Sequence, residues 1–94
     1  MAYFAVTYVY ATDVDLDAVR PDHRRFLRTL ADAGDLVASG PLSGDRPSAL
    51  LLFKADSSDA VSQLLAEDPF QRAHFVTDTT IAEWDPVIGV FAQA

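Results

Sequence analysis

Two ionisable residues stand where the sequence pattern calls for apolar side chains. His23 lies three and four residues before Phe26 and Leu27, which begin an apolar stripe at helical spacing, and Asp68 continues the stripe of a second predicted helix in the same way. Side chains three or four positions apart share one face of a helix, so both residues are expected to point into the protein. If they meet, the carboxylate fixes the tautomer of the imidazole and supports its protonated form, while the other ring nitrogen acts as a general base or acid. His23 and Asp68 are therefore the candidate catalytic residues.

The same two residues also allow a purely structural interpretation. Asp68 could cap a backbone N–H at a helix end, and His23 could fill space beside Pro21. The sequence does not give the distance between them, so geometry must decide. An imidazole exposed in a solvent-reachable cavity favours catalysis, and a sealed pair favours a structural role.

The rest of the chain supplies the elements that must position this pair. The first helix is expected to begin at Pro21, whose missing N–H suits a first turn, and to end at Gly34. The second helix follows a cap at Ser57 or Ser58 and ends at Pro69, because the residue before a proline is pushed out of the helical region. Segments rich in β-branched, aromatic and other apolar residues predict four strands. These strands are 2–10, 35–42, 48–55 and 75–84.

The resulting order β-α-β-β-α-β predicts an α+β fold of the ferredoxin-like type, a βαββαβ sandwich in which two helices cover one face of a four-stranded antiparallel sheet. Ninety-four residues make a single domain, 1–94, with one core. In this topology the first helix starts and the second helix ends at the same end of the sandwich. The fold is therefore expected to bring His23 and Asp68 to one end of one cavity.

Both faces of the predicted sheet are apolar, although two helices can cover only one of them. The opposed sets are Phe4, Val6 and Tyr8 against Tyr3, Ala5 and Val9 in the first strand, and Ala49, Leu51 and Phe53 against Leu50 and Leu52 in the third. A sheet of this kind is buried on both sides, which predicts a homodimer packed sheet against sheet. The apolar C-terminal tail, 86–94, is expected to join that interface or to pair with an edge strand.

Composition and charge exclude several classes of partner. Seven basic and fourteen acidic residues give a net charge of −7, which repels nucleic acid and anionic lipid. Without cysteine there is no disulfide, thiol nucleophile or zinc–cysteine site, and His74 has no partner at metal-ligand spacing. We therefore expect a cytoplasmic protein with no metal, no cofactor, no nucleic acid partner and no membrane segment.

Three short segments of the chain resemble, in order, segments of the YciI-like (YCII-related) family. They are "RPDHRRFL", "LVASGPL" and "AEDPF", within a resemblance that runs from Tyr3 to about Trp84. The resemblance places the family's histidine on His23 and its aspartate on Asp68. It also implies a dimeric ferredoxin-like fold of the muconolactone-isomerase type, a dimeric α/β barrel. One departure is His74, where the family usually has glycine, and this either alters the cavity mouth or changes only a loop.

The resemblance also implies an activity. Most members have no assigned reaction, and one characterised kind is a dehydrochlorinase that acts on a chlorinated hydroxyhydroquinone. We therefore expect a cofactor-free enzyme that uses His23 and Asp68 for general acid–base chemistry, namely elimination, isomerisation or hydrolysis, on a small cyclic or aromatic molecule. The alternative is a non-catalytic dimer that binds a small ligand or associates with another protein.

Five more residues are candidates for substrate binding. Tyr8 and Ser39 could line the cavity, although core packing and turn chemistry explain them equally well. The resemblance places a turn at the cavity rim, and the full candidate set is Tyr8, Ser39, Gly40, Pro41 and His74.

Four arginines surround His23 in the sequence. Arg24, Arg25 and Arg28 are predicted to face away from the apolar stripe and to form a solvated surface. Arg20 is assigned to the surface as well, with contact to an anionic substrate as its alternative.

Overall fold

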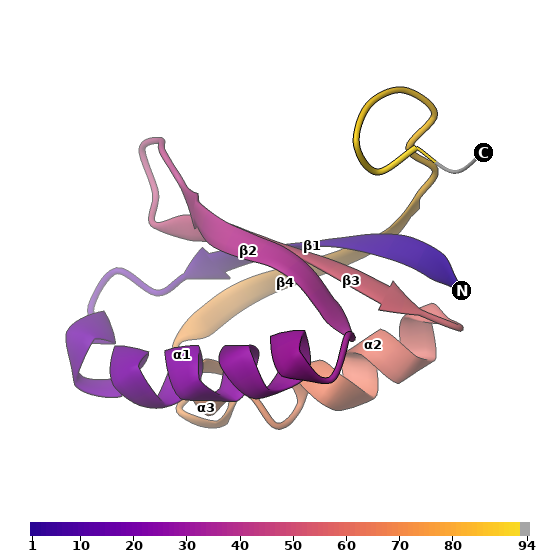
Figure 1. The fold of residues 1–94 in the computed structure, drawn as a ribbon. Coiled ribbons are helices and arrows are strands. Elements are labelled where there is room, and N and C mark those ends of the chain that lie inside the picture. The colour runs from indigo at the N-terminus through magenta and orange to yellow at the C-terminus, as the bar shows by residue number, and fades with distance from the viewer. Residues whose placement is uncertain (93–94) are drawn as a thin grey trace.

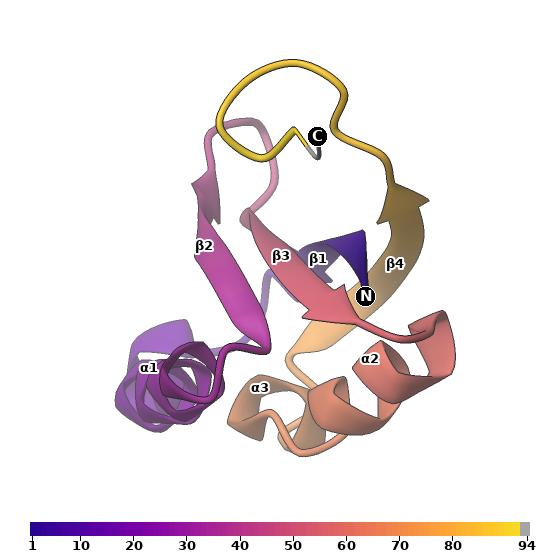
Figure 2. The same cartoon turned by 45° about the vertical axis from the view of Figure 1, so that its right-hand side comes forward.

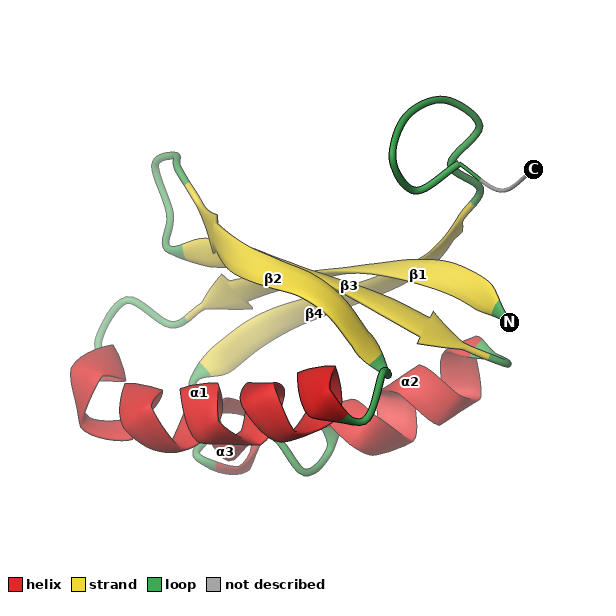
Figure 3. Ribbon diagram, viewed as in Figure 1, coloured by secondary structure: helices red, strands yellow, loops and turns green. Residues whose placement is uncertain are grey.

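The helices lie on one side of a single sheet, and the C-terminal tail lies on the other side (Figure 1). The computed structural model describes residues 1–92. The elements, coloured by type in Figure 3, are β1 (Ala2–Tyr10), α1 (Leu16–Asp32), β2 (Leu36–Leu42), β3 (Ser48–Ala55), α2 (Ser58–Leu65), α3 (Pro69–Arg72) and β4 (Val76–Trp84). The four predicted strands are confirmed to within one residue at each end.

The sheet is antiparallel throughout and has the strand order β2-β3-β1-β4. β1 and β3 therefore lie in the middle, and both helical connections cross the same face. This arrangement is the ferredoxin-like fold that the order of elements predicted. α1 and α3 pack against each other beneath the sheet, so the fold brings residues from both halves of the chain together.

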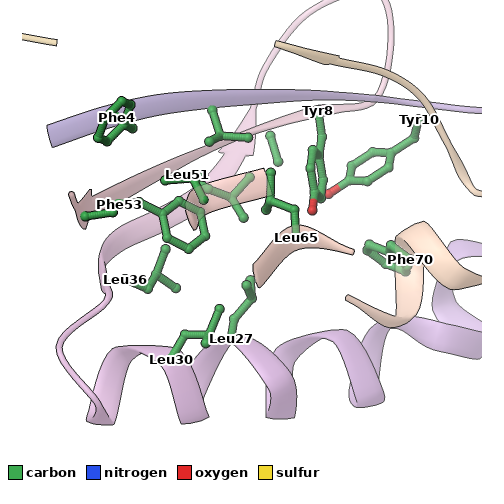
Figure 4. Packing of buried hydrophobic residues seen from close by; sticks show 14 residues of the cluster. Phe4, Tyr8, Tyr10, Leu27, Leu30, Leu36, Leu51, Phe53, Leu65 and Phe70 are labelled. Atoms are coloured by element: carbon green, nitrogen blue, oxygen red, sulfur yellow. The ribbon is translucent and has the colours of Figure 1, made fainter. Parts of the chain in front are cut away.

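The helix-covered face of the sheet forms the core (Figure 4). Successive side chains of a strand point to opposite faces, so every second residue of β1 and β3 is directed to the helices. The buried side chains from these strands are Phe4, Val6, Tyr8, Tyr10, Ala49, Leu51, Phe53 and Ala55. The helices contribute Leu27, Leu30, Val61, Leu65 and Phe70. Full burial of one large apolar side chain stabilises a fold by about 1.5–3 kcal/mol, so this face holds the domain together.

α1 begins at Leu16, and the prediction that it begins at Pro21 was wrong. Asp15, in extended conformation, stands at the N-cap position. Leu16 and Val19 pack against the core, which explains the additional turn. Pro21 lies inside the helix and cannot donate a hydrogen bond to the carbonyl of Asp17. Packing of the first turn on the core outweighs the loss of this hydrogen bond.

The other helix ends follow the sequence signals more closely. Gly34 has a φ of 89°, in the left-handed region, and its N–H bonds to the carbonyl of Ala31 after the last turn of α1. Ser57 is the N-cap of α2, and its hydroxyl accepts a hydrogen bond of 3.1 Å from the N–H of Ala60. Gly34 was predicted in this role, and Ser57 was one of the two predicted caps.

Asp68 does not belong to the second helix, contrary to the prediction. α2 ends at Leu65, and Asp68 (φ −64°, ψ 127°) is the N-cap of a separate short helix, α3. A proline forces the preceding residue into an extended conformation and itself suits the first position of a helix. Pro69 therefore starts a helix here, and Asp68 is still directed inward.

The face of the sheet opposite the helices carries the tail (Figure 2). Phe91 packs there against Tyr3 and Trp84, with ring centroids 6.0 and 6.2 Å apart. The described part of the tail forms no strand, and residues 93–94 of the predicted tail lie outside the described residues. Its place in a dimer stays a prediction. Within residues 1–92, no helix is long and apolar enough to cross a membrane.

Candidate active site

His23 lies on the inner face of α1 and is 7% exposed. Its Nδ1 is 2.7 Å from Oδ1 of Asp68, at the start of α3. The fold therefore brings the two inward-facing ionisable residues into hydrogen-bond contact.

The carboxylate of Asp68 is fully buried and accepts three hydrogen bonds. Oδ1 accepts from the ring of His23 and, at 3.0 Å, from the N–H of Phe70, and Oδ2 accepts from the hydroxyl of Tyr8 at 2.9 Å. A buried carboxylate needs such donors in place of water. Asp68 thus caps α3 and holds His23 at the same time, so the structural and catalytic interpretations of this residue are compatible.

Tyr8 stands behind Asp68 and has no exposed surface. Burial first, and then the neighbouring charge of Asp68, raise the pKa of Tyr8 far above its usual range. The hydroxyl therefore remains a donor at neutral pH and fixes the second carboxylate oxygen.

The ring of His23 turns its other nitrogen to a cavity. Because a carboxylate can only accept, Nδ1 carries the proton of the neutral ring, and Nε2 is left with a free lone pair. Nε2 makes no hydrogen bond to a described residue. Because every buried side-chain nitrogen and oxygen in residues 1–92 has a hydrogen-bond partner, Nε2 is not buried and is open to the cavity. The ring stacks on Phe70, with centroids 4.1 Å apart and planes 20° apart. This stacking fixes the direction in which Nε2 points.

The cavity has a volume of about 310 Å³ and lies between α1, α3 and the β2–β3 part of the sheet. It is lined by Tyr10, Arg20, His23, Arg24, Leu27, Ser39, Gly40, Pro41, Ala49, Leu51 and Phe70. Small-molecule sites typically span about 300–1,000 Å³, and a cavity near 150 Å³ already holds benzene. The volume suits one substituted six-membered ring. In the described part of the chain, no three His, Cys, Asp or Glu side chains are grouped to hold a metal ion.

Tyr10 adds a polar group to the cavity wall. Burial, followed by the charge of Asp68, raises the pKa of Tyr10 to about 12, although Arg20 acts in the opposite direction. Its hydroxyl bonds to no described side chain and is not sealed off. Tyr10 can therefore donate a hydrogen bond to a ligand at neutral pH.

The residues predicted to bind substrate fall in three places. Ser39, Gly40 and Pro41 line the cavity, but from within β2 rather than from a turn. Tyr8 contacts Asp68 and does not reach the cavity surface. His74 is exposed beyond the end of α3 and is not among the lining residues. A role in substrate binding stays a prediction for each of them.

His74 adopts a left-handed backbone conformation, with a φ of 60°. It follows the C-cap residue of α3, and the next N–H, that of Phe75, bonds back to the carbonyl of Phe70 at 3.0 Å. Glycine is the usual residue at this position of a helix end because it has no Cβ to clash. The geometry supports the loop interpretation of the glycine-to-histidine departure.

Arg24 is exposed, as predicted for the solvated surface, and it also lines the cavity together with Arg20. The positions 20, 23, 24 and 27 follow the i, i+3, i+4, i+7 spacing of one helix face. That spacing was visible in the sequence. The inner face of α1 was defined there by apolar residues alone, so the place of Arg24 beside the cavity was not predicted, whereas substrate contact was already the alternative for Arg20.

Comparison with known sequences assigns the chain to a family. The profile of the YCII-related domain matches residues 1–85, a span that contains the whole sheet, His23 and Asp68. The chain belongs to the YCII-related family. No curated protein matches this YCII-related chain significantly.

Solved structures share the fold. The 5-chloro-2-hydroxyhydroquinone dehydrochlorinase TftG from Burkholderia phenoliruptrix AC1100, in complex with 2,5-dihydroxybenzoquinone, is 23% identical over 88% of this chain and 93% of its own, with a TM-score of 0.71. An antibiotic biosynthesis monooxygenase is 16% identical over 94% and 100%, with a TM-score of 0.60. SnoaB, a cofactor-independent oxygenase from Streptomyces nogalater, is 12% identical over 96% of both chains, with a TM-score of 0.55. At these identities the likeness establishes the fold alone.

Proposed function

We propose that this YCII-related protein is an enzyme that needs no cofactor and carries out acid–base chemistry, namely elimination, isomerisation or hydrolysis, on a small cyclic or aromatic molecule. One observation carries the proposal. Nδ1 of His23 lies 2.7 Å from Oδ1 of the buried Asp68, and the opposite side of the ring faces a cavity of about 310 Å³. A histidine oriented by a carboxylate and open to a ligand site is the arrangement that general acid–base catalysis requires.

The proposed mechanism moves one proton at Nε2 of His23. Nε2 takes the proton from the substrate or from a water, and Asp68 stabilises the imidazolium that results. In an elimination, the electron pair left on the substrate forms the new double bond, and the leaving group departs with its bonding electrons. In an isomerisation, Nε2 returns the same proton to a different atom. The ring of Phe70 holds the imidazole in one orientation through both steps.

The walls of the cavity support a ring as the substrate. Leu27, Leu51 and Phe70 supply apolar surface, while Tyr10 and Ser39 supply hydroxyl groups. The structural relative TftG is named for a reaction on a chlorinated, hydroxylated ring, and its structure contains another hydroxylated ring. A molecule of that size fits the volume found here.

A test of the proposal offers hydroxylated and halogenated hydroquinones, beginning with 5-chloro-2-hydroxyhydroquinone, and measures chloride release and the absorbance of the ring. His23→Gln and Asp68→Asn should each lower the rate by at least about 100-fold, because general acid–base groups contribute that much or more. Asn remains a good N-cap residue, so Asp68→Asn should leave α3 folded. The matched control is Asp32→Asn, which removes an exposed carboxylate from the end of α1.

The variants also separate the two functional interpretations. A rate in Asp68→Asn equal to that of the wild type would contradict the acid–base role. Saturable binding of ring compounds without any turnover would favour the non-catalytic ligand-binding dimer.

We also propose that the protein is a homodimer packed through the open face of the sheet. That face carries an apolar hollow of about 440 Å³. Its lining residues are Ala5, Ala38, Ser39, Gly40, Pro41, Leu42, Leu50, Leu52, Trp84 and Phe91. Ser39, Gly40 and Pro41 also line the cavity beside His23, so a partner that fills the hollow contacts the far side of the cavity wall.

Light scattering at micromolar concentration measures the oligomeric state. The expected mass is twice that of the chain, and Leu50→Asp should halve it, since a charge in an apolar interface is costly. A stable wild-type monomer would contradict the proposal. The cytoplasmic location stays a prediction.

A further inference from the structure

One face of α1 carries both a potential base and positive charge into the cavity. Arg20, His23, Arg24 and Leu27 all line it, at the i, i+3, i+4 and i+7 positions of the helix. Residues at this spacing are neighbours on the helix surface. Arg20 and Arg24 therefore lie beside His23 on the cavity-lining face of α1, and Arg24 is also exposed to solvent.

The cavity wall contains no carboxylate, although the chain as a whole has a net charge of −7. Asp68 lies behind His23 and is sealed from the cavity. Arg20 forms an ion pair with Asp17, whose side chain is exposed. For Arg24, residues 1–92 provide no ion-pair partner, whereas Arg25 on the outer side of the helix is paired with Asp22 at 3.0 Å. The cavity is thus a local positive region on an acidic protein.

Uncharged donors complete this polar side of the cavity. The hydroxyl of Tyr10 remains protonated at neutral pH and bonds to no described side chain. The hydroxyl of Ser39 likewise has no partner among residues 1–92 and lies on the β2 wall. Carboxylates and ionised enols or phenols are acceptors, and guanidinium and hydroxyl donors match them. Leu27, Leu51 and Phe70 add apolar surface to the same cavity, which suits the apolar face of a ring.

We propose that the substrate of this site is an anion, a single ring bearing a carboxylate or an ionised hydroxyl, and that Arg24 and Arg20 select it by charge. The ring packs on the apolar lining residues, with its anionic group at the arginines. The binding part of this inference is independent of catalysis. The catalytic part rests on the proposed acid–base function, since removal of a proton by His23 leaves negative charge on the substrate, which the same guanidinium groups stabilise.

Benzoate and benzamide are matched probes, because they share one ring and one shape and differ in charge. Equilibrium binding is measured by NMR titration of the backbone amides around the cavity. The wild type should bind benzoate about tenfold more tightly than benzamide, equivalent to about 1.4 kcal/mol. Arg24→Gln should remove most of this preference, and Arg20→Gln should remove part of it, because Asp17 already offsets its charge. Added salt should weaken the binding of benzoate and leave that of benzamide unchanged.

The control variant is Arg28→Gln, which removes the same charge one turn farther along α1 from a residue that does not line the cavity. It should retain the full preference for benzoate. Equal binding of the two probes, binding of neither, or an equal loss in Arg28→Gln and Arg24→Gln would overturn the inference. Gln is a good helix former, and the thermal melt of each variant checks the fold.

The two proposals fail in different ways. If the wild type prefers benzoate and Asp68→Asn retains full turnover, the acid–base function is contradicted and anion selection stands. If the wild type shows no preference for benzoate over benzamide while turnover depends on Asp68, only anion selection is contradicted.

Discussion

The two faces of the sheet are built from equally apolar strands, yet they meet different surroundings. On the helix-covered face Val6 and Tyr8 have no exposed surface, whereas on the open face Leu50 and Trp84 are 41% and 42% exposed. The covered face also holds the buried Asp68 and its three donors, at the place where α1 and α3 leave a cavity. A face covered by helices can therefore hold a buried carboxylate with its donors, while the open face offers mainly apolar surface for another protein to cover.

The adjacent residues Leu50 and Leu51 of β3 point to opposite faces of the sheet. Substitution of each one tests the difference between the two faces, with the largest expected effect. Leu51 is 1% exposed, so Leu51→Ala removes packed side-chain atoms and should lower the free energy of unfolding by about 3 kcal/mol. Leu50→Ala should cost less than about 1 kcal/mol at concentrations where the chain is monomeric, and more where it is dimeric. Urea unfolding at several protein concentrations measures both effects. A cost for Leu50→Ala that is large and independent of concentration would contradict the proposed role of the open face.

High pH provides a second test, directed at the hydroxyl groups of the covered face. The pKa of Tyr10 is about 12 in the folded chain, against ~10 for an unperturbed tyrosine. The unfolded chain therefore loses this proton first as the pH rises. The contribution to stability is complete below pH ~10 and falls as the pH rises through about 12, by at most about 2 kcal/mol, because solvent screens part of the effect. The raised pKa of Tyr8 likewise lowers the stability of the folded chain at high pH.

Stability curves measured at neutral pH and above pH ~10 check this expectation. Tyr10→Phe has no proton to lose at this position, so its stability should fall less steeply than that of the wild type. An identical slope in the two proteins would mean that the surroundings of Tyr10 do not raise the pKa of its hydroxyl in the folded chain.

Removal of the Tyr8 hydroxyl tests the support behind the catalytic pair. Tyr8→Phe takes away the hydrogen bond of 2.9 Å to Oδ2 of Asp68 and leaves a buried carboxylate oxygen without its donor, which should cost about 2 kcal/mol. Tyr10→Phe is the matched control at neutral pH, since its hydroxyl bonds to no described side chain. Thermal melts measure the cost, and nitrogen NMR of the His23 ring reports whether Nδ1 still carries the proton. Equal costs for the two variants would show that the bond to Asp68 contributes nothing.

The strands and their order were predictable because the signals are local. An alternating or continuous apolar run identifies each strand, and the order of elements then leaves few topologies. The inward direction of His23 followed in the same way from its spacing to Phe26 and Leu27. The homodimer, in contrast, was inferred from the doubly apolar sheet and stays a proposal.

Other features depend on contacts between distant residues and could not be predicted from local pattern. The start of α1 is determined by packing of Leu16 and Val19 on the core, which outweighs the signal of Pro21. The bond from Tyr8 to Asp68 joins residues that are 60 positions apart in the sequence, and no pattern along the sequence measures such a distance. The cavity-lining position of Arg24 was missed for a different reason, since the helical spacing indicated it but the polarity of the residue argued against it.

The smallest expected effect concerns the loop after α3, at the edge of the covered face. His74 has a φ of 60°, where a side chain crowds the backbone, at a cost of roughly 1 kcal/mol. His74→Gly should therefore raise the stability by up to about 1 kcal/mol, reduced by the greater freedom that glycine gives the unfolded chain. Because His74 is exposed and is not among the cavity-lining residues, benzoate binding and turnover should not change. Thermal melting and the benzoate titration measure the two expectations separately. A change in binding without a change in stability would mean that His74 acts at the cavity mouth, which was the other interpretation of the departure from glycine.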